Sequence, residues 1–452
     1  PRLGEAGQSS RFASEARRVS EASDLQLTTK IKKEKLVQQS IFENSDLSTD
    51  KQKNLSEKII EEIEIPLTPI LKEMKNWGIK VDMDKLSDRK SLTDGEIKEL
   101  AKKIYDEADS VFNINSPKQL LEILKEKFGL KIKSTNFEKL NVLREKLPVA
   151  DLVLRYRELF KLKTTYIEPL IELGKEDKNN RVHPTFVQLK AATGRITCEN
   201  PNLQNIPDAI RDVFVADKGF KLASFDYSQI ELRILASITN DQKMLEAFEK
   251  SLDIHRITAS QIFNVSLDSV SGKMRQVAKT LNFGIVYGMG ARLLAQESGL
   301  PLNEAKKFIS EYFNDFPAVK KWREQIVLEA RQSGFVENLN GRKRMLPEII
   351  SFNQRIQAEA ERMAINFPIQ SLAADIIKLA MIKTKEELAK LGFWEVKAKM
   401  LLTIHDELVF EILDDADLKK IVGLINKTME SVYKLKVLLK VNFKIGNNWG
   451  EI

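Results

Sequence analysis

Two acidic residues stand where apolar strands are expected to end. Residues 221–225 form an apolar run that leads into Asp226, and Asp406 lies in an acidic turn between apolar runs at 400–404 and 408–412. A carboxylate at such a position is costly unless it is paired or bound to a metal. If both strands share one sheet, the two carboxylates could bridge two Mg²⁺ ions roughly 3.5–4 Å apart, the geometry of in-line phosphoryl displacement. Taken singly, Asp226 has an alternative role as a helix N-cap and Asp406 as a turn residue.

A predicted helix that begins near residue 275 carries four side chains spaced four apart, which places them near one face: Arg275, Lys279, Phe283 and Tyr287. Two cations followed by two rings suit a nucleoside triphosphate laid along the helix, with phosphates on the cations and base and sugar against the rings. Gly284 and Gly288 would loosen the helix end, as suits an element that closes on a substrate. The alternative is an amphipathic surface helix with incidental charges.

Bulk composition narrows the class of protein only a little. The 452 residues suggest two to four domain-sized units, and the net charge of +7 is a weak sign of a polyanionic partner. A single cysteine, Cys198, excludes an intrachain disulfide and a Cys-based zinc site. No apolar run approaches the roughly 18 residues of a membrane span, so we expect no membrane partner. We also expect a monomer.

The chain changes character twice along its length. Residues 1–55 are polar and lack a sustained apolar pattern, which predicts a flexible or remnant leader. Residues 56–165 are helical in pattern and rich in lysine, with a helix start at Ser116 and Pro117. Such an arm could hold a phosphate backbone, or it could be an ordinary helical domain. Strands appear among helices after about residue 180, which predicts a helix-rich α+β class.

The motifs in this chain resemble those of the family A DNA polymerases, the bacterial DNA polymerase I group. Residues 226–233 (DYSQIELR) are similar to motif A, residues 275–288 (RQVAKTLNFGIVYG) to motif B, and residues 405–409 (HDELV) to motif C. Further similar blocks are found at 193–195 (TGR), 201–207 (PNLQNIP) and 361–375. The motifs occur in the correct order, and the resemblance covers about residues 55–452.

The resemblance implies a right-hand fold with an antiparallel-sheet palm, helical fingers and a helical thumb. Its regions would be a leader at 1–55, the thumb at 56–165, the palm at 166–240 and 351–452, and the fingers at 241–350. It also implies template-directed addition of dNTPs to a primer 3′-OH with release of pyrophosphate. Two Mg²⁺ ions, which Mn²⁺ can replace, would be held by the catalytic acids Asp226 and Asp406 and by the backbone carbonyl of Tyr227.

The remaining site residues are also implied by the resemblance. Nucleotide binding would involve Gln229, Glu231, His255, Arg275, Lys279, Phe283 and Tyr287. Among these, Glu231 would crowd a ribose 2′-OH and so exclude ribonucleotides. Primer–template DNA would be contacted by Arg195, Gln204, Asn205, Arg362, Gln370 and His405, with Glu407 and Asn366 in supporting roles.

Some features depart from the family pattern or leave alternatives open. The stretch from Pro207 to Arg211 is shorter than usual, and too few residues precede the thumb-like region for a 3′–5′ exonuclease, so we expect none in this chain. One alternative is a ribonucleotide-using polymerase of similar shape, against which Glu231 argues. Another is a catalytically silent primer–template-binding scaffold, which would be expected to have lost an aspartate or Lys279. The expected location is a bacterial or phage-infected cytoplasm, with an organelle as the alternative.

Overall fold

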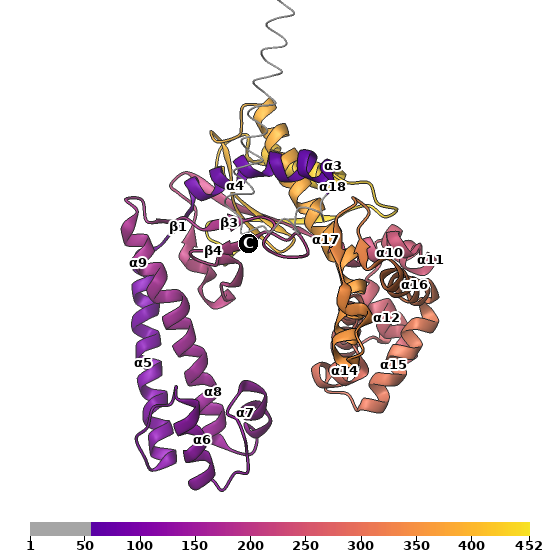
Figure 1. The fold of residues 1–452 in the computed structure, drawn as a ribbon. Helices are drawn as coiled ribbons and strands as arrows, with labels where there is room; N and C mark the ends of the chain where they lie inside the picture. The colour runs from indigo at the N-terminus through magenta and orange to yellow at the C-terminus, as the bar shows by residue number, and fades with distance from the viewer. Residues whose placement is uncertain (1–55) are drawn as a thin grey trace, which may run out of the picture.

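The computed structural model describes residues 56–452. The predicted leader at 1–55 lies outside the described residues. Helices dominate, and every ladder between named strands in the described part is antiparallel. Two helical lobes hang from opposite ends of a central sheet (Figure 1). The predicted helix-rich α+β class is therefore confirmed.

A four-stranded sheet with the order β11-β6-β10-β9 forms the centre of the molecule. Its strands are β6 (Phe220–Tyr227), β9 (Ala398–Ile404), β10 (Glu407–Leu413) and β11 (Val441–Gly446). The three predicted strands are present, and Asp226 lies within the last two residues of β6 rather than after it. Phe225 and Phe410 pack edge to face and are fully buried. The hydroxyl of Tyr227 on this same face donates to the Met429 carbonyl of α18 (Leu418–Ser431) at 2.7 Å.

Helix α17 (Gln354–Lys390) runs from the lobe on the right of Figure 1 into the sheet layer, and it contacts elements of both. By length and composition alone it could cross a membrane, but 78% of its apolar window is buried inside the fold. Its buried charges are paired, since Arg342 contacts Asp375 at 2.6 Å and Lys378 contacts Glu64 at 2.7 Å. Helix α17 is therefore a core helix of the fold, and its buried Asp375 and Lys378 are each paired with an opposite charge.

The left-hand lobe in Figure 1 is a long helical arm with a core of its own. Its amphipathic helices bury residues such as Ile104, Leu120 and Val153. Ser116 caps the second helix as predicted, accepting from the Gln119 amide, and Pro117 opens it. The arm consists of α5 (Met83–Ala108), α6 (Pro117–Glu126), α7 (Phe137–Leu143), α8 (Pro148–Lys161), η2 (Leu162–Ile167) and α9 (Glu168–Glu176).

The first described helices do not belong to this arm. They are α3 (Glu57–Ile59), η1 (Ile60–Glu64) and α4 (Ile65–Trp77). Helix α4 packs against α17 and β9, and its Leu67 and Ile70 are part of the main core around the sheet. The helical stretch at 56–165 therefore divides between the sheet layer and the arm.

The right-hand lobe in Figure 1 is a cluster of helices that follows the central strand β6. It consists of α10 (Ile230–Thr239), α11 (Gln242–Glu249), α12 (Ile254–Phe263), η5 (Leu267–Ser269), α13 (Gly272–Val286), α14 (Ala291–Ser298), α15 (Leu302–Asp315) and α16 (Pro317–Ser333). A hairpin of β7 (Phe335–Glu337) and β8 (Lys343–Met345), followed by η6 (Pro347–Ile350), leads into α17.

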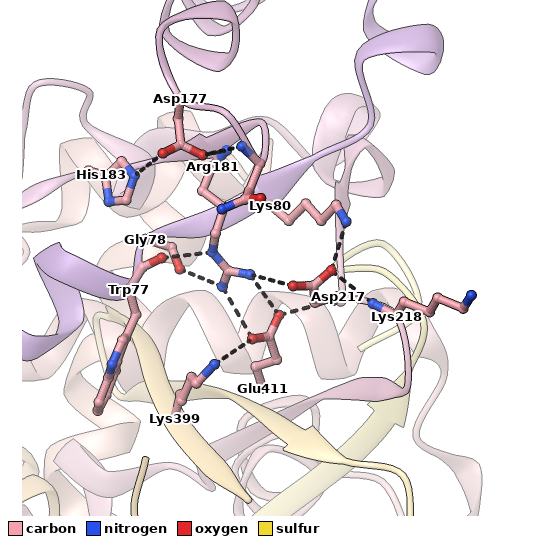
Figure 2. A network of polar contacts seen from close by, with 11 residues as sticks. Trp77, Gly78, Lys80, Asp177, Arg181, His183, Asp217, Lys218, Lys399 and Glu411 are labelled. Atoms are coloured by element: carbon pink, nitrogen blue, oxygen red, sulfur yellow. Dashed lines mark hydrogen bonds and ion pairs between the residues drawn. The ribbon is translucent and has the colours of Figure 1, made fainter. Parts of the chain in front are cut away.

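A three-stranded sheet joins the arm to the centre. Its strands are β1 (Ile79–Val81), β2 (Arg181–Val182) and β5 (Phe214–Val215). Between β2 and β5 along the chain lie an antiparallel two-stranded sheet and two short 3-10 helices. They are β3 (Thr185–Val187), β4 (Thr197–Glu199), η3 (Leu203–Asn205) and η4 (Asp208–Val213). Figure 2 shows Arg181 at this junction, where it donates to the carbonyls of Trp77 at 2.7 Å and Gly78 at 2.9 Å. The same guanidinium meets Glu411 of β10 through two bonds of 3.2 and 3.3 Å.

We expect Arg181→Met to lower the free energy of unfolding by about 3–5 kcal/mol, because it leaves the fully buried Glu411 carboxylate without its main cation. Chemical denaturation followed by circular dichroism measures this cost. The double variant Arg181→Met/Glu411→Gln should recover most of the loss, since the buried charge is gone.

The matched control is Lys383→Gln, which breaks an exposed ion pair with Glu386 on α17. It should change stability by less than about 0.5 kcal/mol. A loss below about 1 kcal/mol for Arg181→Met would contradict the role given to this junction.

Candidate active site

The two predicted catalytic acids are brought together by the backbone. Residues Glu407 and Asp226 are paired in the ladder between β10 and β6, and the Tyr227 amide donates to the Asp406 carbonyl at 3.2 Å. Asp406 and His405 form the two-residue turn between β9 and β10, with His405 at a φ of 54°. The carboxylates, 180 residues apart in sequence, thus reach one pocket.

Asp226, Asp406 and Glu407 lie close together, and nearby positive charges offset their negative charge only in part. Burial, followed by the charges of Asp406 and Glu407, raises the pKa of Asp226 to about 7. Burial also raises the pKa values of Asp406 and Glu407. The charges of His405 and Arg195 oppose this rise at Asp406, and Arg211 and a bond from Ser224 oppose it at Glu407. Within residues 56–452, neither Asp226 nor Asp406 forms an ion pair with a lysine or arginine.

Helix α13 presents its predicted face to these acids. Arg275, Lys279, Phe283 and Tyr287 line the same pocket of about 530 Å³ as Asp226 and Asp406. The opposite face of the helix is buried as expected, through Val277, Ala278, Leu281 and Ile285. The further residues lining the pocket are Arg195, Tyr227, Gln229, Ile230, Glu231, His255, Ala373, Ala374, Ile377 and His405.

Arg275 is oriented by an acid whose role the sequence did not reveal. Its Nε donates to Asp253 Oδ2 at 2.6 Å, while Oδ1 of the same carboxylate caps α12 by accepting from the His255 amide at 2.9 Å. Burial acts to raise the pKa of Asp253, but the hydrogen bond and charge of Arg275 outweigh it and hold the pKa below its usual value. Because Nε is engaged, the two terminal nitrogens of the guanidinium remain for an anion in the pocket.

His255 is buried behind the cationic end of the helix. Burial, with the positive charges of Arg275 and Lys279, lowers the pKa of His255 to about 4 despite the nearby Asp253 carboxylate. The imidazole is therefore neutral at pH 7. Its Nδ1 lies 2.9 Å from the side-chain carboxamide nitrogen (Nδ2) of Asn282. From the sequence alone, no role was assigned to Asn282.

Glu231 lines the pocket and is held there by two residues from different parts of the chain. Arg195 donates from Nη2 to Oε1 at 2.6 Å, and the Tyr287 hydroxyl donates to Oε2 at 2.8 Å. Burial raises the pKa of Glu231, against the influence of these partners. The carboxylate thus links the end of α13 to the loop that carries Arg195.

That loop depends on a glycine. Gly194 has a φ of 76°, and a Cβ there would lie 2.9 Å from the buried guanidinium of Arg342. The close approach leaves no room for a larger residue at the position before Arg195. Gln229, at a φ of 53°, similarly precedes α10 in the left-handed region and lines the pocket.

Most of the residues predicted to contact or support the DNA fall into two groups. Gln204 lies with Arg195 and His405 around a neighbouring pocket of about 220 Å³, and its Nε2 donates to the carbonyls of Ile196 and Thr403. A second group lies along α17 and outside both pockets. Arg362 abuts Gly288 at the end of α13, and Asn366 carries a buried carboxamide oxygen without a partner in the described residues.

Three predicted residues lie at the margins of the site. Gln370 is half-buried on α17, and Asn205 is exposed at the end of η3. Glu407 is paired with Asp226 in the ladder but does not line the main pocket.

Comparison with known proteins is consistent with this geometry. The chain is 40% identical over 406 residues to the thermostable DNA polymerase I of Thermus thermophilus, covering 86% of this chain and 48% of that protein. It is 42% identical over 431 residues to DNA polymerase I of Bacillus subtilis, covering 92% of this chain and 47% of that protein. The chain thus spans about half the length of these curated relatives.

A solved structure shares the fold. It is the POL domain of Pol1 from M. smegmatis in complex with DNA primer-template and dNTP, with a TM-score of 0.82 and 34% identity. The match covers 87% of this chain and 71% of that chain, and it confirms the right-hand α+β fold. A family model described as DNA polymerase family A matches residues 83–451, a stretch that contains the arm, the paired acids and helix α13. The chain therefore belongs to DNA polymerase family A.

Proposed function

We propose that this chain is a template-directed DNA polymerase that adds dNTPs to a primer 3′-OH and releases pyrophosphate. The observation that carries the proposal is the single pocket in which Asp226 and Asp406 face the cations and rings of α13. The M. smegmatis relative supports it, since that domain is described with primer-template DNA and a dNTP.

The acids suit hard divalent cations. Two buried carboxylates without cationic partners, one with its pKa raised to about 7, are an oxygen donor set that gains from a positive ion. No cluster of three or more His, Cys, Asp or Glu side chains suited to a metal occurs in residues 56–452, so substrate oxygens and water would complete the coordination. Asp226, Asp406 and the Tyr227 carbonyl would hold two Mg²⁺ ions, and Mn²⁺ could replace them. When bound, the ions would lower the pKa of the primer 3′-OH and stabilise the leaving pyrophosphate.

The protein's own residues bind and orient the nucleotide. Arg275 and Lys279 contact the triphosphate as cations, and His255 contacts it as a neutral donor. Phe283 stacks against the base and sugar, and Tyr287 lies by the templating position. Glu231, held by its two partners, occupies the space of a 2′-OH, and Gln229 lies close by.

The DNA is held on the remaining surfaces. Minor-groove acceptors shared by all correct base pairs would be contacted by Arg195, Gln204, Asn205, Arg362, Gln370 and His405, with Glu407 and Asn366 in support. In hand terms, the arm is the thumb, the central sheet with α17 is the palm, and the helices from α11 to α16 are the fingers. We further propose a monomer that acts on DNA in a bacterial cytoplasm, in line with its bacterial relatives.

Asp226→Asn should reduce the rate of primer extension by roughly 10³-fold or more, because it removes a charged metal ligand worth several kcal/mol. Primer–template affinity should stay within about threefold of the wild type. Single-turnover extension and fluorescence anisotropy measure the two quantities. Extension at the wild-type rate would refute the role of Asp226.

Two controls accompany that variant. Asp414→Asn, at an exposed acid beyond the far end of β10, should leave extension unchanged. Because the folded-state pKa of Asp226 lies above its unfolded value, its ionisation destabilises the fold as pH rises from about 4 to 7. Asp226→Asn should therefore melt at or above the wild-type temperature at pH 8, which shows that lost activity is not lost folding.

Binding of Mn²⁺ to the free protein should strengthen as pH rises through about 7 and then level off. The reason is that a proton on Asp226 competes with the ion until that carboxyl ionises. Electron paramagnetic resonance of free Mn²⁺ between pH 5.5 and 8.5 provides the affinity without any turnover. Asp226→Asn should show weaker binding with no inflection near pH 7. An affinity independent of pH in the wild type would contradict the site.

Glu231→Ala should lower the preference for dNTPs over rNTPs by roughly 10- to 100-fold, since it opens the space proposed for a 2′-OH. The ratio of kcat/KM values for dATP and ATP measures this preference. Glu231→Gln retains the shape and should keep most of the preference, even though its bond from Arg195 is weaker. Equal discrimination in the wild type and Glu231→Ala would place the sugar elsewhere.

A further inference from the structure

One of the two ring nitrogens of His255, Nδ1, has a polar contact, and its partner is Asn282. Nδ1 lies 2.9 Å from Nδ2 of Asn282, and both residues are buried. The ring also packs against Phe283, with centroids 5.7 Å apart. Since His255 lines the main pocket and Nδ1 is occupied by Asn282, Nε2 on the other side of the ring is the atom available to the pocket.

Asn282 is in turn held by a second residue on the neighbouring helix. Its Oδ1 lies 3.1 Å from the Thr258 hydroxyl, which also lies 2.9 Å from the Ile254 carbonyl one turn earlier in α12. A hydroxyl has a single proton, so Thr258 can donate it fully to only one of these two oxygens. Asn282 and Thr258 are both buried. Asparagine is a poor helix former, so a fully enclosed asparagine in the middle of α13 calls for a polar reason.

We propose that Asn282 is a positioning residue: it donates to Nδ1 of His255, which keeps the ring proton on Nε2, directed at a phosphate oxygen of the bound nucleotide. In this arrangement Thr258 donates its single hydroxyl proton to Oδ1 of Asn282 rather than to the Ile254 carbonyl, which keeps Nδ2 of the carboxamide facing the ring. The inference deepens the proposed function and rests on it for the identity of the anion.

The position of this proton matters because the ring carries only one. The groups facing His255 are the Asp253 carboxylate and the cations of Arg275 and Lys279, and together with burial they lower its pKa to about 4. A neutral imidazole with its proton on Nδ1 would turn a lone pair toward the phosphate oxygens and repel them. With the proton on Nε2 the same ring donates a hydrogen bond without adding a third cation to the pocket.

The tautomer can be observed directly, because the chain contains only three histidines, His183, His255 and His405. Long-range ¹H–¹⁵N correlation spectra of the ¹⁵N-histidine-labelled protein at pH 7 should show His255 as the Nε2–H tautomer. The variants His183→Gln and His255→Gln assign the signals. A wild-type spectrum showing the Nδ1–H tautomer or an imidazolium would overturn the inference, whatever the outcome of the polymerase assays.

Variants then connect the tautomer to nucleotide binding. Asn282→Asp offers Nδ1 only an acceptor, so His255 should move to the Nδ1–H form or become charged. Asn282→Leu removes the donor altogether and should raise the dNTP KM roughly threefold to tenfold with a smaller change in kcat. Thr258→Val should shift His255 toward the Nδ1–H tautomer, as Asn282→Asp does. Thr258→Ser keeps the hydroxyl and should behave as the wild type.

A double-mutant cycle separates positioning from general support of the fold. In a His255→Ala background, Asn282→Leu should have no further effect on the dNTP KM, because its effect passes through the ring. Additive losses in KM would show that Asn282 acts otherwise and would overturn the inference. If the dNTP KM is insensitive to His255→Ala while the wild-type tautomer is as expected, the proposed triphosphate contact fails and the Asn282–His255 pairing stands.

Discussion

Antiparallel pairing of β6 with β10 brings the carboxylates of Asp226 and Asp406 into one pocket. Placing two like charges together out of water is unfavourable, and the surrounding elements are arranged around this pair. Backbone hydrogen bonds set the register, so the acids cannot move apart without breaking the central sheet. Burial and mutual repulsion raise the pKa of Asp226, and no basic side chain among residues 56–452 pairs with either acid. The fold thus maintains a negative site at its centre that nearby Arg195 and His405 balance only in part, and a divalent cation would relieve the remaining charge.

Around this site, the groups proposed to meet the nucleotide are each held by a further residue. Asp253 orients Arg275, Asn282 contacts His255, and Glu231 is held by Arg195 and Tyr287. Supports of this kind limit the rotamers of the side chains in the pocket and so prepare them for binding. Most of them connect α13 to α10 or α12, which means that any movement of α13 would change several contacts together.

The arm and the opposite lobe are joined to the centre by buried charged residues. Arg181 connects the root of the arm to Glu411 on β10, and Arg342 joins Asp375 of α17 to Glu64 (Figure 2 shows the first of these). Arg342 also lies close against Gly194, in the loop that carries Arg195 to the pocket. Enclosed pairs of this type contribute defined geometry more than net stability, because desolvation offsets much of their attraction.

Local patterns in the sequence determined the strands that end at the acids, the cap at Ser116 and the spacing of Arg275, Lys279, Phe283 and Tyr287 on one helix face. These features depend on neighbours within a few residues, and periodicity reports them directly. Only the tertiary structure decided that α4 packs on the sheet layer, that Asn282 contacts His255 and that Arg181 pairs with Glu411, 230 residues away. Such pairs leave no periodic trace in one sequence, because their partners meet only after the helices and strands have packed.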